Sequence, residues 1–261
     1  MIGIFDSGVG GLTVVKELKK QLPGVSYIYL GDTARTPYGN RGPETIKRYA
    51  EEDVNFLIAR GATVIVVACN TASAVAGEYL KQKFSLPIFE VITSAAQAAA
   101  RVAKKKVGVI GTRATIGSDS YQRLLRAEND QLEIIGQTCP LLVPMVEENF
   151  ISKPEMKMII RRYLYPLKCQ EIDTLILGCT HYPLIREMIQ EKIGRRVKLI
   201  DPAREIIMAL AEFLNSHPDS AKGDDASSRY FSTDINSRFK TIAESWLGEG
   251  IKVESADLTN L

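Results

Sequence analysis

An internal repeat is the feature that most constrains the fold of this 261-residue chain. Residues 2–5 align with residues 107–110, and residues 64–71 align with residues 174–181, each pair a little over 100 residues apart. The matched segments are short apolar runs, typical of parallel strands that crossover helices bury on both faces. Because the chain runs through the same plan twice, we predict an α/β fold of two pseudo-symmetric doubly wound domains with largely parallel sheets.

Further apolar runs complete the two predicted sheets. A helix is expected to begin at Pro43, since proline suits a first turn and apolar side chains from Ile46 to Leu57 fall on one face. An alanine-rich helix is expected over residues 93–104, with the lysines at 104–106 complementing the negative end of its dipole. The predicted strands cover residues 2–5, 25–30, 64–68, 87–91, 107–110, 132–136, 174–178 and 197–200.

The last part of the chain continues the α/β pattern after a polar stretch. Residues 215–228 are predicted to form a loop. A strand is expected over residues 229–233, then a helix opened by Asp234, then a strand near residues 251–254. The sequence does not say on which half this tail packs.

Composition narrows the functional class. With 45% hydrophobic residues, 25% charged residues and a net charge of +2, the chain has neither the profile of a disordered protein nor the basic excess of a nucleic-acid binder. No apolar stretch approaches the roughly 20 residues that cross a bilayer, and no signal sequence is evident. Four cysteines without a C-x-x-C pair, and two histidines, favour neither a disulfide scaffold nor a metal site. We expect a cytoplasmic small-molecule protein with reduced thiols.

Two cysteines occupy equivalent places in the repeat. Cys69 and Cys179 each follow a predicted strand and precede cap residues of a helix, where partial positive charge stabilises a thiolate. Ligands of doubly wound sheets bind at this edge. A single free cysteine is usually a buried apolar residue, but its repetition favours chemistry for this pair. Cys139 and Cys169 lack such repetition and are predicted to be buried.

The glycine-rich turn at residues 6–11 lies where a dinucleotide-binding fingerprint would lie, but it does not match one. Thr13 stands at the third glycine position, and Asp6 would repel a pyrophosphate. Asp32, after the second strand, mimics the ribose-binding acid only loosely. The carboxylate of Asp6 and the hydroxyl of Ser7 instead suit a ligand that carries both an ammonium and a carboxylate group.

Other candidates have plain structural alternatives. His181 lies two residues after Cys179, close enough to assist that thiol, whereas His217 is expected at the surface. Asp32 could be a simple helix cap, Tyr38 could serve packing within a turn, and Glu147 could be an exposed acid.

Four motifs together resemble those of the glutamate racemase family: residues 5–12, 31–39, 67–72 and 177–183. The resemblance spans nearly the whole chain, and no departure is seen at these positions. It implies a cofactor-independent racemase with its active site between two similar α/β domains. It further implies that the enzyme supplies D-glutamate for peptidoglycan, and thus for cell wall biogenesis and cell shape. The implied domains are residues 1–92 plus 204–261 and residues 93–203.

The resemblance also implies roles for individual residues. Cys69 and Cys179 would form the acid/base pair, Cys179 deprotonating L-glutamate and Cys69 deprotonating D-glutamate, with Asp6 and His181 assisting. Asp32 and Glu147 would be acids that tune the site. No metal, cofactor, nucleic acid or membrane is implied, and a homodimer is expected. The residues implied to bind substrate or assist the thiols are Asp6, Ser7, Tyr38, Gly39, Asn70, Thr71, Thr180 and His181.

Elementary chemistry agrees with two thiols. To racemise an amino acid, a base must remove the α-proton from one face while an acid delivers a proton to the other, so two groups must stand on opposite sides of Cα. Two alternatives remain open at this point. One is a related racemase or decarboxylase acting on aspartate, a hydantoin or a malonate derivative, and the other is an amino-acid sensor with structural cysteines.

Overall fold

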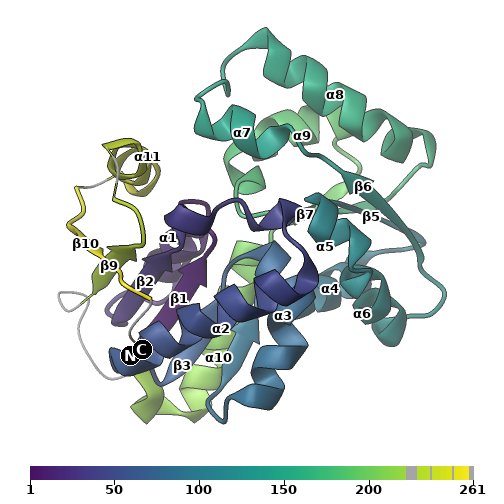
Figure 1. Cartoon of the computed structure of the whole chain (residues 1–261). Coiled ribbons are helices and arrows are strands. Elements are labelled where there is room, and N and C mark those ends of the chain that lie inside the picture. The colour runs from purple at the N-terminus through teal and green to yellow at the C-terminus, as the bar shows by residue number, and fades with distance from the viewer. Residues whose placement is uncertain (222–227, 236, 249, 259–261) are drawn as a thin grey trace.

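The computed structural model describes residues 1–221, 228–235, 237–248 and 250–258, and it contains two wholly parallel sheets (Figure 1). The first sheet has the order β10-β9-β2-β1-β3-β4 and the second the order β6-β5-β7-β8. The strands are β1 (Ile2–Asp6), β2 (Tyr27–Gly31), β3 (Val64–Val67), β4 (Ile88–Glu90), β5 (Lys106–Gly111), β6 (Glu133–Thr138), β7 (Thr174–Gly178), β8 (Lys198–Ile200), β9 (Arg229–Ser232) and β10 (Val253–Ser255).

The two sheets share one topology, which confirms the predicted fold class. The order β2-β1-β3-β4 in the first sheet repeats as β6-β5-β7-β8 in the second. The repeated segments at residues 2–5 and 107–110 form the corresponding strands β1 and β5, each pairing with the second and third strands of its half. The cysteines that follow β3 and β7 therefore lie at matching carboxyl ends of the two sheets.

Helices cover both faces of the first sheet because its strands alternate apolar side chains between two cores. Ile2 and Ile4 of β1 belong to the core under α1 (Leu12–Gln21), α4 (Val91–Val102) and α10 (Pro202–Ser216). The opposite face packs against α2 (Pro43–Ala59) and α3 (Asn70–Lys83), which lie together over this sheet in Figure 1. Helix α4 also packs against β7, so it joins the two sheets.

The second sheet has its own helical cover. Helices α8 and α9 pack against each other, and their apolar side chains form a third core with those of β7. Pro154 and Glu155 occupy the first turn of α8, where both residue types are favoured. The helices of this half are α5 (Arg113–Gly117), α6 (Ser120–Glu128), α7 (Leu142–Glu147), α8 (Pro154–Cys169) and α9 (Arg186–Ile193).

The tail of the chain returns to the first sheet. Strand β9 pairs in parallel with β2, and β10 pairs with β9, at the positions predicted for both strands to within two residues. The intervening helix, α11 (Ser237–Leu247), begins later than the predicted start at Asp234. Residues 222–227 of the predicted loop lie outside the described part of the chain. The domain boundaries at 92/93 and 203/204 stay predictions.

Two local predictions were wrong. Helix α4 ends at Val102, and the lysine run leads into β5 instead of closing the helix, because the backbone N–H groups at 104–106 all donate to the carboxylate of Asp173 at 2.8–3.1 Å. Helix α10 continues through Ser216, past the predicted start of the loop, because its apolar residues keep helical spacing up to the buried Leu214. Within the described residues, no helix combines the length and the apolar character needed to cross a membrane.

Candidate active site

A cavity of about 250 Å³ opens where the carboxyl ends of the two sheets face each other, and residues of both halves line it. Its lining comes from segments that follow six strands, β1, β2, β3, β5, β6 and β7, because the strands of a parallel sheet all end at the same edge. The first half contributes Ser7, Thr36, Pro37, Tyr38, Gly39, Asn40, Cys69, Asn70 and Thr71. The second half contributes Thr112, Arg113, Cys139, Pro140, Val143, Pro144, Glu147, Glu148, Cys179, Thr180 and His181.

Cys69 caps the N-terminus of α3 and is held in a polar setting. Its Sγ accepts the backbone N–H of Ala72 at 3.5 Å, and the thiol donates to Oγ of Ser7 at 3.6 Å. Burial, followed by the nearby charge of Asp6, raises the pKa of Cys69 to about 12. In the free protein, Cys69 is therefore a thiol with a proton to give.

Asp6 lies behind the cavity wall at the end of β1, with 1% of its surface exposed. Its carboxylate accepts two hydrogen bonds, one from the backbone N–H of Gly8 at 3.1 Å and one from the hydroxyl of Thr180 at 3.5 Å. Burial raises the pKa of Asp6, and the charge of His181 opposes that rise. Asp6 therefore touches both halves of the site, beside Cys69 in one and Thr180 in the other.

Cys179 has a histidine where Cys69 has none. Nδ1 of His181 lies 3.8 Å from Sγ of Cys179, and Nε2 lies 3.0 Å from Oε1 of Glu147. Burial alone would lower the pKa of His181, but hydrogen bonds to Cys179 and Glu147 outweigh it and raise the pKa to about 10. At neutral pH the ring thus carries a proton, and it lies within reach of the Cys179 sulfur.

Hydrogen bonds among hydroxyl and amide groups connect the two halves of the site. Oδ1 of Asn70 accepts the hydroxyl of Tyr121 at 2.7 Å, which leaves the amide nitrogen as the donor side of Asn70. Oγ1 of Thr71 lies 2.9 Å from Oγ1 of Thr112 and 3.2 Å from Oγ1 of Thr115. This cluster of three threonines ties the start of α3 to the turn after β5.

The loop after β2 forms another wall of the cavity. Gly39 packs so closely against Thr112 that a Cβ atom at position 39 would lie 2.7 Å from the Thr112 Cβ. The hydroxyl of Tyr38 lies within hydrogen-bond distance of Asp32 and Asp53, neither of which lines the cavity, and is thus directed away from the cavity. Asp32 does not line the cavity; it lies in this separate network.

Most residues predicted from the sequence are brought together at the cavity, whereas several lining residues were missed. Thr112, Pro140 and Val143 were not predicted, although the repeat contains a signal for Thr112, which stands 105 positions after Ser7. Cys139 is buried as predicted and also contacts the cavity, but Cys169 is exposed at the end of α8, so its predicted burial was wrong. Among the residues that the structure describes, no group of three or more His, Cys, Asp or Glu side chains could hold a metal ion.

Comparisons with known proteins agree over nearly the full length. The family model described as Asp/Glu/Hydantoin racemase matches residues 2–210. A glutamate racemase of Geobacter metallireducens is 45% identical over 252 residues, which cover 95% of this chain and 92% of that protein. The crystal structure of glutamate racemase isoform RacE1 from Bacillus anthracis has a TM-score of 0.93 at 40% identity, covering 99% of this chain and 97% of that one. Glutamate racemase from Francisella tularensis, solved in complex with D-glutamate, also has a TM-score of 0.93, at 36% identity and with 100% and 98% coverage.

Proposed function

The chain belongs to the Asp/Glu/hydantoin racemase family and racemises glutamate, and we propose that it does so by proton exchange at Cys69 and Cys179. One observation carries this mechanism. Two thiols, from equivalent strand ends of two sheets with the same topology, line one cavity. A substrate whose Cα lies between them has one thiol on each face, as racemisation requires.

The unequal surroundings of the thiols set the direction of the first turnover. The pKa of Cys69, about 12, keeps its proton in place, so Cys69 serves as the acid. Cys179 lies 3.8 Å from Nδ1 of His181, a ring that can exchange a proton with it, and serves as the base. The family resemblance implies that Cys179 faces the α-proton of L-glutamate, so in that direction Cys179 removes the α-proton and Cys69 supplies the new one. The product state, with the protons exchanged, is set for D-glutamate.

The carbanion that forms between the two steps needs stabilisation from fixed dipoles. The N-terminus of α3 directs backbone N–H groups toward this end of the sheet, and the amide nitrogen of Asn70 adds a donor. The hydroxyls of Thr71 and Thr112 lie on the same lining. Pro37, Pro140 and Val143 make part of the wall apolar, which limits water around the reacting carbon.

Isotope incorporation tests the two-thiol mechanism directly. When L-glutamate is converted in deuterated water, the D-glutamate formed at low conversion should carry deuterium at Cα, while the recovered L-glutamate carries little. The reverse reaction should give the mirror result. Mass spectrometry of chirally separated samples measures both. Substantial protium carried from substrate into product would mean that a single base acts on both faces, contrary to the mechanism.

Three further expectations come from the family resemblance. The activity should survive exhaustive dialysis against a chelator without added pyridoxal phosphate or nucleotide, and restoration of lost activity by a metal would contradict this.

A bacterium that requires D-glutamate should grow without it when it produces this chain in its cytoplasm, as expected of a supplier for peptidoglycan. Sedimentation equilibrium should give the mass of a homodimer.

A further inference from the structure

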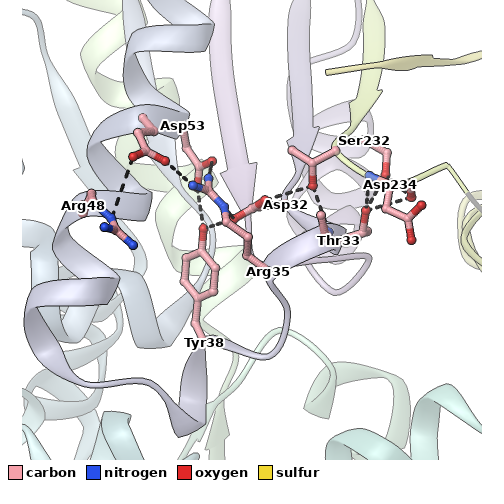
Figure 2. A network of polar contacts seen from close by, with 11 residues as sticks. Asp32, Thr33, Arg35, Tyr38, Arg48, Asp53, Ser232 and Asp234 are labelled. Atoms are coloured by element: carbon pink, nitrogen blue, oxygen red, sulfur yellow. Dashed lines mark hydrogen bonds and ion pairs between the residues drawn. The ribbon is translucent and has the colours of Figure 1, made fainter. Parts of the chain in front are cut away.

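A buried charge network lies directly behind the wall that Tyr38 forms. Asp32 and Asp53 are both 0% exposed, and the Tyr38 hydroxyl lies within hydrogen-bond distance of both, 2.9 Å from Asp53, so that its one proton is shared between the two acids. Arg35 pairs with Asp32 at 2.6 Å and with Asp53 at 3.1 Å, and it also contacts Glu52. Figure 2 shows the phenol oxygen of Tyr38 directed into this group of charges.

The network extends to the tail of the chain. Oγ1 of Thr233 donates to Oδ1 of Asp32 at 2.9 Å and accepts the backbone N–H of Ala34 at 2.9 Å. Thr233 directly follows β9, so a residue some 200 positions away in sequence supports the loop after β2. Asp32, Arg35, Tyr38, Asp53 and Thr233 are together named the Tyr38 anchor.

Charge makes the anchor sensitive to the loss of any member. Burial, and next the charge of Asp32, raise the pKa of Asp53 well above its ordinary value, because one guanidinium faces several carboxyl groups. Burial and the same two acids raise the pKa of Tyr38, so its hydroxyl stays protonated and remains a donor. A buried acid that lost this donor would keep its desolvation cost without the compensating bond.

The anchor lies behind one wall of the cavity. Residues 36–40 all line the cavity, and Gly39 is held against Thr112 of the second half. Within residues 36–40, the Tyr38 phenol is the side-chain group that contacts the two buried acids. Tyr38 is itself buried, with 1% of its surface exposed. Releasing the phenol would let the loop move away from Thr112 and widen the cavity, whereas the two thiols are held by other elements.

We propose that the Tyr38 anchor positions the 36–40 wall of the cavity and thereby sets the affinity of the enzyme for glutamate. Its members are positioning residues and take no part in moving the proton. This inference rests on the proposed function, because the readout is glutamate racemisation.

Tyr38→Phe is the first test, with Tyr49→Phe as its control. Tyr49 lies on α2 with its ring 5.5 Å from that of Tyr38, but its hydroxyl has no hydrogen-bond partner among the described residues. Tyr38→Phe should raise KM for both enantiomers about tenfold and change kcat less than about threefold. Tyr49→Phe should leave both constants within about twofold of the wild type.

Thr233 provides a second test outside the cavity. Thr233→Val removes the hydroxyl with little change of shape and should raise KM in the same direction as Tyr38→Phe, by about threefold. Thr233→Ser keeps the hydroxyl and should restore the wild-type KM. If Tyr38→Phe does not fold, as judged by its thermal melt, the Thr233 pair decides.

The outcomes separate the inference from the proposed function. A fall in kcat with KM unchanged in Tyr38→Phe would mean that the anchor acts on proton transfer, and unchanged constants in Tyr38→Phe and Thr233→Val would mean that the wall needs no anchor. Either result overturns the inference while wild-type racemisation persists. Absence of glutamate racemisation in the wild type would instead overturn the proposed function.

Discussion

Thr71 and His181 occupy equivalent positions in the two halves of the site, two residues after Cys69 and Cys179 respectively. The threonine bonds to two other threonine hydroxyls, whereas the histidine ring contacts Cys179 and Glu147. The position two residues after the thiol is therefore neutral in the first half and titratable in the second. This difference breaks the symmetry that the repeat builds into the site.

The charge on His181 should appear as a pH dependence of stability. Its pKa rises from an ordinary value of 6.5 to about 10 in the folded protein, so its contribution is complete below about pH 6.5 and is lost as the pH rises through 10. The free energy of unfolding in urea should fall across this window in the wild type and fall less in His181→Asn. Parallel curves for the two proteins would contradict the assignment.

Loss of either paired thiol should abolish racemisation. Cys69→Ala and Cys179→Ala should each lower kcat/KM by at least about a thousandfold in both directions, because each thiol acts once as acid and once as base. Cys169→Ala is the control, since that cysteine is exposed at the end of α8. A chiral assay measures the rates, and near-wild-type activity in both of the first two variants would refute the pair.

Substitutions of Thr112 and Thr115 should have different effects, although the two hydroxyl groups belong to one hydrogen-bonded cluster. Thr112 lines the cavity, whereas Thr115 is 0% exposed behind it. Thr112→Val should raise KM for glutamate about tenfold, since a group on the cavity wall is lost. Thr115→Val should mainly reduce stability, by about 1 kcal/mol, the usual value of a buried hydrogen bond. Kinetics and urea unfolding of both variants test this, and equal KM values would argue against a binding role for Thr112.

Gly10→Ala should damage catalysis through contact with the second half of the site. A Cβ atom at position 10 would lie 2.2 Å from Oγ1 of Thr180 and 2.6 Å from the His181 ring. The ring must shift, so kcat should fall at least about tenfold, because small displacements of catalytic groups are costly. Gly117→Ala is a matched control, since a Cβ there meets nothing within 4 Å. Equal kcat values for the two variants would contradict this prediction.

Local sequence patterns were sufficient for the strands and for the position of Cys69 and Cys179 at matching strand ends. Buried parallel strands are apolar throughout, and this signal needs no knowledge of distant residues, so β1, β3 and β7 were predicted within one residue of their bounds. The repeat then placed Cys69 and Cys179 at matching strand ends. The helix after Val102 was misjudged because Asp173, remote in sequence, binds the backbone there.

What the sequence by itself determined is the repeated plan and the position of two thiols at its strand ends. Only the tertiary structure decided which side chains meet across the halves. It paired Glu147 with His181, and it turned the Tyr38 hydroxyl toward Asp32, away from the cavity. The physical reason is that strand periodicity is recorded locally in the chain, whereas these contacts depend on how separate turns approach one another in space.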